Sequence, residues 1–169
     1  AKDKATQMLA AHRQDVFNDP RSPVAGNPKG DVTLVEFFDY RCPYCKQVEP
    51  ALEKIIGDDH QLRFVFKEFP VLGPESEVAA RVALAARKQG KYDAFHRAMM
   101  GTTGRIDQAV IFKVAASAGV DVDKARQDMK SPDVEQELKA NLDLGRALDL
   151  DGTPSFIVGS TIVPGRSEE

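Results

Sequence analysis

The sequence has 169 residues and a formal net charge of −3 at pH 7; 42% of the residues are hydrophobic and 29% are charged. Such a chain suits one globular domain, or one domain with an insertion, and is long enough to bury a core without disulfide staples. It carries no basic stripe and no run of 18 apolar residues, which argues against nucleic acid as a partner and against a membrane-spanning helix.

The N-terminal region lacks the apolar core of a signal peptide. This fits either a cytosolic protein or a mature form whose signal has been removed. Residues 3–18 have helical spacing and end at Asn18-Asp19-Pro20, a helix-stopping combination. This helix could serve oligomerisation, but its short apolar stripe favours packing on its own domain. Residues 21–30, rich in Pro and Gly, predict a connector with a short strand at 23–25.

The next elements predict a βαβ unit. Residues 33–38 form a short run dominated by β-branched and aromatic side chains, which indicates a buried strand. Residues 46–57 carry one helical apolar stripe, with Gly57 expected as the C-terminal cap and Pro50 expected to kink the helix. Residues 61–67 alternate as a second strand does, and strand–helix–strand over this length predicts a parallel pair.

The pattern is helical almost throughout residues 74–149, and two short strand-like runs separated by Gly159-Ser160 follow as a predicted hairpin. The helices are expected at 75–89, 91–100, 107–118, 121–130 and 133–148, and the strands at 155–158 and 161–163.

These elements divide the chain into three parts: an N-terminal helix (1–20), an α/β domain (21–73 and 150–169) and an inserted helical domain (74–149). An open sheet of this kind needs helices on both faces. Because only six residues follow the last predicted strand, we expect a further helix outside this sequence, or a partner, to cover one face.

The two cysteines, Cys42 and Cys45, form a C-x-x-C motif between the first strand and the helix after it. On a first helical turn they can close a disulfide, and the helix N-terminus lowers a thiol pKa from about 8.5 towards roughly 3.5–7.5. Pro43 is tolerated at the first helical position. We therefore predict that Cys42 is the nucleophile and Cys45 the resolving thiol.

Metal binding is the alternative for the same residues. A structural zinc site needs four ligands, and His12, His60 and His96 are too scattered to complete one with the cysteines. Coordination of copper(I) by the two thiolates remains a chemically allowed alternative. No other cofactor is expected.

A second motif, Gly152-Thr153-Pro154-Ser155, lies just before the predicted hairpin. Pro154 is an ordinary turn proline, or it belongs to a cis-proline loop that faces the cysteines and offers its backbone to a substrate. In the second case Pro43, Tyr44, Thr153 and Pro154 would contact the substrate.

Three segments in this order resemble the DsbA-like branch of the thioredoxin superfamily: residues 32–45 (VTLVEFFDYRCPYC), 67–73 (KEFPVLG) and 152–156 (GTPSF). The resemblance extends over about residues 20–165. It implies an α/β thioredoxin fold with an inserted helical domain, a cis Thr153–Pro154 bond and a secreted, usually periplasmic location, with the N-terminus a mature one.

Two positions depart from the strongly oxidising members, which carry Cys-Pro-His-Cys and usually valine before the cis-proline. Tyr44 and Thr153 are more similar to the suppressor-of-copper-sensitivity (ScsC-type) proteins, and Thr-Pro also resembles the periplasmic isomerases. Without the histidine, one group that stabilises the Cys42 thiolate is lost. We therefore predict a potential less oxidising than the about −120 mV of DsbA.

Glu36 lies in an otherwise apolar strand six residues before Cys42, where a carboxylate is costly to bury. As the resemblance implies, it would accept a proton from Cys45 through water; the alternative is an edge-exposed glutamate. Lys67 is expected to pair with Glu36 or to be a solvated strand end.

Together these features predict a periplasmic enzyme that exchanges disulfides with protein thiols. They favour isomerase or reductase activity over strong oxidase activity. A membrane redox partner would recycle it. The alternatives are a copper-tolerance protein that uses the same thiolates and a DsbA-type oxidase.

Overall fold

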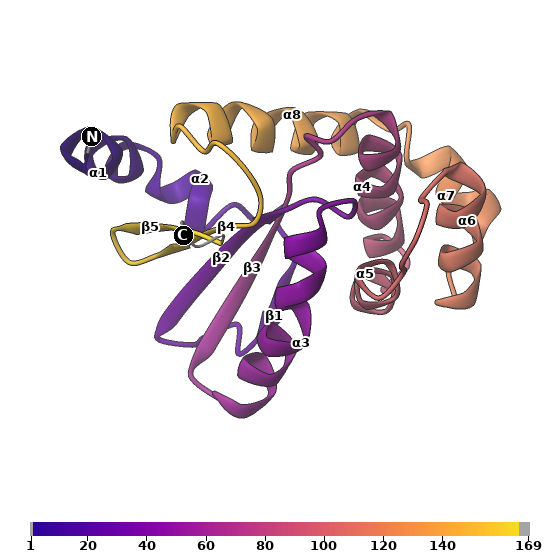
Figure 1. Ribbon diagram of the computed structural model, residues 1–169, viewed down its shortest axis with the longest axis horizontal. Coiled ribbons are helices and arrows are strands. Elements are labelled where there is room, and N and C mark those ends of the chain that lie inside the picture. Colours follow the sequence, from indigo (N-terminus) through magenta and orange to yellow (C-terminus); the bar gives the residue numbers. More distant parts are fainter. Residues whose placement is uncertain (1, 166–169) are drawn as a thin grey trace.

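A five-stranded sheet forms the centre of the computed structural model, which describes residues 2–165 and the side chains of residues 4–165 (Figure 1). The spatial order is β1-β3-β2-β4-β5. β2 and β3 run parallel and the other neighbours antiparallel, so the predicted βαβ unit and hairpin are confirmed. The strands are β1 (Val24–Gly26), β2 (Val32–Phe38), β3 (Leu62–Glu68), β4 (Ser155–Val158) and β5 (Thr161–Pro164).

Helix α3 (Pro43–Asp58) joins β2 to β3 and packs on one face of the sheet. It continues across Pro50 and past Gly57 to a C-cap at Asp59, so the prediction that Gly57 ends the helix is wrong. A Cβ at Gly57 would meet nothing within 4 Å, and its φ is not in the left-handed region that a glycine cap uses.

The opposite face of the sheet is covered by α1 (Lys2–Ala11), α2 (Arg13–Phe17) and the end of α8 (Pro132–Ala147). The predicted single N-terminal helix is broken at His12. These helices pack on their own domain, as their short stripe favoured, and helices from the described chain lie on both faces of the sheet. The buried cluster consists of Leu9, Val16, Phe17, Val35, Phe37, Val65, Phe69, Leu144, Leu148 and Ile157.

The insertion follows β3 as α4 (Pro74–Arg87), α5 (Tyr92–Met100), α6 (Gln108–Ser117), α7 (Val122–Asp128) and α8. Its predicted helices are confirmed. Helix α4 contacts each of the other four, because alanines along it let neighbours approach closely on all sides. Figure 1 shows α4 to α7 gathered beside the sheet on the side of α3, whereas α8 runs back across the top of the view towards α1.

One hydrophobic core joins the insertion to the α3 face of the sheet. Phe38, Phe64 and Phe66 from the strands pack in the same cluster as Phe95 and Met99 from α5. The insertion therefore packs against the end of the sheet where β2 runs into α3. Among the helices of residues 2–165, none has the length and apolar character needed to cross a membrane.

Candidate active site

Cys42 is the N-cap of α3, where the chain changes from extended to helical conformation (φ −83°, ψ 117°). Its sulfur accepts a hydrogen bond from the backbone N–H of Cys45 at 3.4 Å, and Pro43 occupies the first helical position, where no N–H is needed. Both cysteines are free thiols; Cys42 is 5% exposed and Cys45 is fully buried.

The two thiols differ sharply in acidity. A hydrogen bond from the Cys45 side chain, aided by backbone N–H groups of the first helical turn, lowers the pKa of Cys42 to about 5. The same hydrogen bond, together with burial, raises the pKa of Cys45 far above its ordinary value. Cys42 is therefore largely thiolate at neutral pH, while Cys45 keeps its proton until a base removes it.

The loop before β4 lies against Cys42, although 111 residues separate them in the chain. The Cys42 sulfur lies 3.3 Å from the carbonyl oxygen of Thr153, to which it donates when protonated, and the Thr153–Pro154 bond is cis, as the resemblance implied. The Pro154 carbonyl is already bound by the Gly165 N–H at 2.8 Å. The side chain of Tyr44 is 41% exposed on the helix beside the thiol. Thus Pro43, Tyr44, Thr153 and Pro154 all lie around Cys42.

Glu36 is completely buried on the face of β2 that α3 covers, so the edge-exposed alternative is wrong. Its neighbours in register are Phe66 on β3 and Phe156 on β4. Neither carboxylate oxygen has a hydrogen-bond partner within the described residues. Burial raises its pKa well above the ordinary value, and the nearby charges of Glu49, Cys42 and Glu68 add to this. A carboxyl group with a raised pKa, whose carboxylate form binds a proton more tightly than usual, thus lies behind the dithiol.

Lys67 does not pair with Glu36, and it is not a solvated strand end. Side chains alternate along β3, so Lys67 points to the face opposite Phe66, the register partner of Glu36. Its ammonium is fully buried and donates to the Asp15 carbonyl at 2.6 Å and the Ser22 hydroxyl at 2.8 Å. Lys67 therefore anchors the N-terminal segment.

A buried polar network lies next to Glu36 and was not predicted from sequence. Glu68 accepts hydrogen bonds from the hydroxyls of Tyr40 (2.8 Å) and Tyr92 (2.6 Å). Tyr40 also bonds His96 Nδ1 at 2.9 Å, and His96 Nε2 lies 3.5 Å from a carboxylate oxygen of Glu49. The one sequence signal was Glu49 itself, which follows Cys45 by one helical turn on the buried stripe of α3.

Asp39 is 2% exposed and holds the motif to the loop after β3. Its carboxylate accepts from the backbone N–H groups of Arg41, Val71 and Leu72 and from the Ser76 hydroxyl, at 2.7–3.0 Å. The backbone of Val71 and Leu72, whose side chains are exposed, is thereby tied to the segment that leads into Cys42. Within residues 4–165, no three or more His, Cys, Asp or Glu side chains are grouped as metal ligands.

The comparisons with known proteins agree with this geometry. The family model described as "DSBA-like thioredoxin domain" matches residues 33–169. A thioredoxin-like oxidoreductase from Silicibacter pomeroyi is 45% identical, with a TM-score of 0.89 over 92% of this chain and 90% of that one. The catalytic domain of Proteus mirabilis ScsC is 32% identical, with a TM-score of 0.87 over 96% and 91%.

Among curated sequences, a Na(+)/H(+) antiporter NhaA 1 from Salinispora arenicola is 31% identical over 140 residues. That match takes in 82% of this chain and only 22% of the antiporter, so the chain spans about a fifth of the length of the curated relatives it matches first. The family model, the order of the motifs and the Cys42–Thr153 geometry lead to one assignment. The chain belongs to the DsbA-like thioredoxin family, whose fold carries a thiol–disulfide oxidoreductase site.

Proposed function

We propose that this chain exchanges disulfides with protein thiols in the periplasm, as a weaker oxidant than DsbA that favours isomerisation or reduction. The observation that carries this proposal is the acidic Cys42 thiol at the start of α3, in contact with the Thr153 carbonyl of the cis-proline loop. An extended substrate segment laid along that loop would bring its own sulfur to Cys42.

The chemistry runs through two exchange steps. In the oxidising direction a substrate thiolate attacks the Cys42 sulfur of the Cys42–Cys45 disulfide; a mixed disulfide forms and Cys45 leaves with the electron pair as thiolate, which takes up a proton. A second substrate thiolate then attacks the substrate sulfur of the mixed disulfide, so that the substrate disulfide forms and Cys42 leaves as thiolate. In the reducing direction the Cys42 thiolate attacks a substrate disulfide, and Cys45 then loses its proton and displaces the substrate. Glu36 is the base that receives or returns that proton.

The acidity of Cys42 supports an intermediate potential. A pKa of about 5 lies between the values of about 3.5 for DsbA and about 7 for thioredoxin. Stabilising the thiolate stabilises the reduced enzyme, so the potential should fall between about −120 mV and −270 mV. Tyr44 and Thr153, the residues that depart from the strong oxidases, lie next to the thiol that sets this value.

Titration against glutathione buffers would measure the potential, and a value at or above −120 mV would contradict the proposed direction. Refolding of scrambled ribonuclease, run beside insulin reduction and oxidation of reduced ribonuclease, would separate the activities. Rescue of the scrambled substrate indicates an isomerase, while oxidation alone indicates a DsbA-type role. The Cys42→Ser variant should be inactive in all three.

Two further parts of the proposal concern the cell. The family resemblance supports a periplasmic location, which is tested by fractionating cells that express the natural gene. A membrane partner that restores the working redox state of the dithiol would be trapped by Cys45→Ser, since this variant cannot resolve a mixed disulfide formed on Cys42.

Copper(I) binding is the second candidate, favoured by two free thiols on one helical turn. Titrating copper(I) into the reduced protein, with Cys45→Ser as the control, would decide it. Weak binding, unaffected by the substitution, would dismiss this role.

A further inference from the structure

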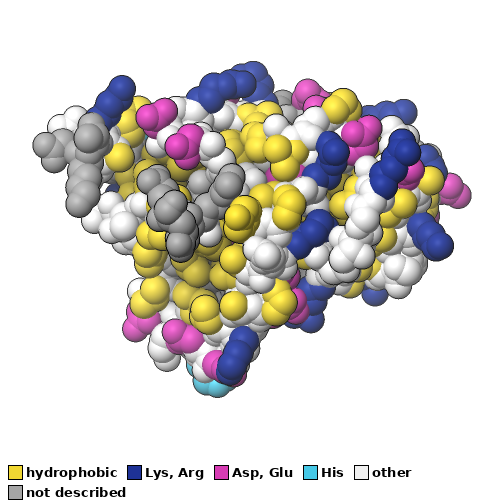
Figure 2. Space-filling model, viewed as in Figure 1, with side chains coloured by type: hydrophobic (Ala, Val, Ile, Leu, Met, Phe, Trp, Pro, Cys, Tyr) yellow, Lys and Arg dark blue, Asp and Glu magenta, His cyan; other side chains and the backbone are white. Residues whose placement is uncertain are grey.

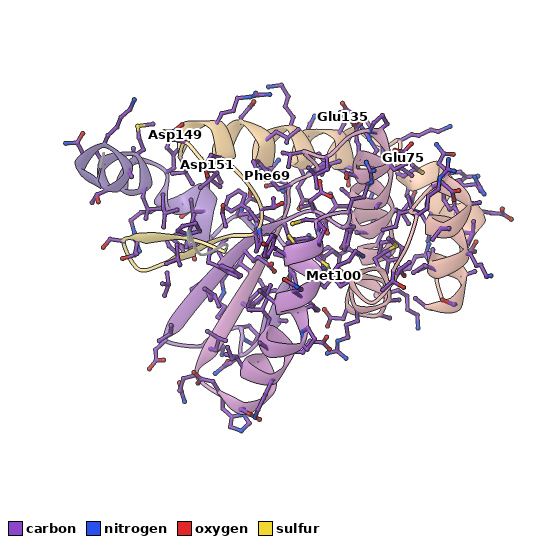
Figure 3. The ribbon with its side chains drawn as sticks, viewed as in Figure 1. Phe69, Glu75, Met100, Glu135, Asp149 and Asp151 are labelled. Atoms are coloured by element: carbon purple, nitrogen blue, oxygen red, sulfur yellow. The ribbon has the colours of Figure 1, made fainter. Side chains whose placement is uncertain are left out.

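A cavity of about 590 Å³ opens beside the active-site motif, between α3 and the loop that joins α5 to α6. Pro43 and Lys46 form its α3 wall, Glu75 at the start of α4 borders it, and residues 102–107 form the opposite wall. Figure 3 shows Glu75 on the α4 side of this region and Met100 between α3 and α5. The cavity shares Pro43 with the immediate surroundings of Cys42.

Cations outnumber carboxylates in this cavity. Arg41, Lys46 and Arg105 line it, against Glu75 and Asp107. Lys and Arg side chains border this part of the surface in Figure 2.

The two carboxylates are already engaged. Asp107 caps α6 by accepting from the backbone N–H of Val110 at 2.9 Å. Glu75 lies 3.8 Å from the guanidinium of Arg41, which also donates to the Leu72 carbonyl. Neither carboxylate is paired with Lys46 or Arg105, and the lining as a whole has one more cation than it has carboxylates.

Lys46 and Arg105 make few hydrogen bonds or ion pairs with the described residues. The Lys46 ammonium is half-buried and donates to the Met99 carbonyl at 2.7 Å, and it forms no ion pair with any carboxylate of residues 4–165. The exposed Arg105 guanidinium makes no hydrogen bond or ion pair within the same residues. Burial lowers the pKa of Lys46, and the charges of Cys45, Asp39 and Cys42 oppose this only in part, so a carboxylate in direct contact would stabilise the ammonium further.

Resting on the proposed function, we propose that this cavity binds acidic residues flanking the cysteine of the substrate, and that Lys46 and Arg105 select for them. An extended chain advances about 3.3–3.6 Å per residue, so a side chain two or three positions from a sulfur bonded to Cys42 reaches across Pro43 into the cavity. The protein's net charge of −3 repels acidic peptides at long range, so a preference for them must come from local contacts.

The test uses three short peptides, each with one cysteine. They differ only at the positions two residues before and two residues after that cysteine, where they carry Glu, Gln or Lys. Each reduces the oxidised protein, and the second-order rate constant is followed by mass spectrometry of acid-quenched samples. Because flanking charge also changes the peptide's own thiol, the readout is the ratio of the wild-type to the variant rate constant for each peptide. The variants are Arg105→Gln, Lys46→Gln and their combination.

Lys29→Gln is the matched control, since Lys29 is exposed and precedes β2, at the end of the strand away from Cys42. We expect each cavity variant to slow the Glu peptide by about two- to fivefold, the range for a solvent-accessible ion pair, and the double variant by the product. The Gln peptide should be unaffected by Arg105→Gln, the Lys peptide should react faster, and high salt should weaken the Glu effect.

Equal effects on the Glu and Gln peptides, or an effect of Lys29→Gln as large as that of Arg105→Gln, would overturn the inference. Failure of the proposed function looks different: the wild-type protein would react with all three peptides no faster than a simple dialkyl disulfide does.

Discussion

Glu36 and Glu68 are two buried glutamates on adjacent strands for which the structure predicts opposite responses to substitution. Both are less than 2% exposed, and both have a pKa raised well above the ordinary value by burial. Glu68 accepts hydrogen bonds from Tyr40 and Tyr92, whereas Glu36 has no protein partner among the described residues. The pair therefore separates the cost of a buried polar group from the value of its hydrogen bonds.

Glu36→Leu removes a buried carboxyl group without a protein partner and puts an apolar side chain of similar size between Phe66 and Phe156. An unsatisfied buried polar group costs about 1–3 kcal/mol, so the free energy of unfolding of the reduced protein should rise by that amount at pH 7. Glu68→Leu should lower it by about 2–5 kcal/mol, because two tyrosine hydroxyls lose their acceptor. Urea unfolding of both variants measures the difference.

The pH dependence provides a second readout. In the unfolded chain Glu36 titrates near 4.5, while in the folded protein it stays protonated to higher pH. Wild-type stability is therefore fully present below pH 4.5 and falls as pH rises towards the folded pKa, whereas Glu36→Leu lacks this loss. The advantage of the variant should be smallest below pH 4.5 and should grow above it.

Catalysis should change in the opposite sense to stability. If Glu36 takes the proton from Cys45, its removal should slow resolution of the mixed disulfide by about 10²-fold, measured in single turnovers. A Glu36→Leu protein that is less stable than wild type, or whose stability difference does not depend on pH, would refute this account of a desolvated, unpaired carboxyl group. Unchanged resolution would refute its role as the base.

Three further predictions follow from single contacts. The Cys42 thiolate should titrate with a midpoint of about pH 5, measured by its ultraviolet absorbance and its alkylation rate. The thiolate should also stabilise the reduced protein: this contribution should be fully present above pH 9.0 and lost as the pH falls through 5. Cys42→Ser, which lacks the thiolate, is the control. Gly145→Ala would drive a methyl group into the ring of Phe69, which lies between the end of β3 and α8 (Figure 3). This substitution should lower the free energy of unfolding, measured in urea, by about 1–3 kcal/mol. Gly57→Ala, where the added methyl group meets open space, should raise it by about 0.5–1 kcal/mol. Lys67→Met should leave the rates of thiol–disulfide exchange unchanged but lower the free energy of unfolding. The loss should be larger at pH 10.5 than below pH 8, because burial lowers the pKa of Lys67 to about 8 and the wild type gains stability between pH 8 and pH 10.5.

The sequence by itself determined the order of the elements and the identity of the reactive pair. Hydrophobic period, Gly and Pro positions and the spacing of Cys42 and Cys45 are local properties, so they predicted the βαβ unit, the insertion helices and the hairpin. The resemblance of three ordered motifs added the cis bond before Pro154. Even locally, the end of α3 was misplaced, because a glycine inside a helix looks like a cap until the backbone conformation at Gly57 is known.

Only the tertiary structure decided which side chains meet. Glu36 and Lys67 were candidates for an ion pair, yet strand register sends them to opposite faces of the sheet. The network from Glu68 to Glu49 and the cations around the cavity come from elements far apart in the chain. No local pattern reports such contacts, because they depend on how β2, α3 and the insertion pack against one another.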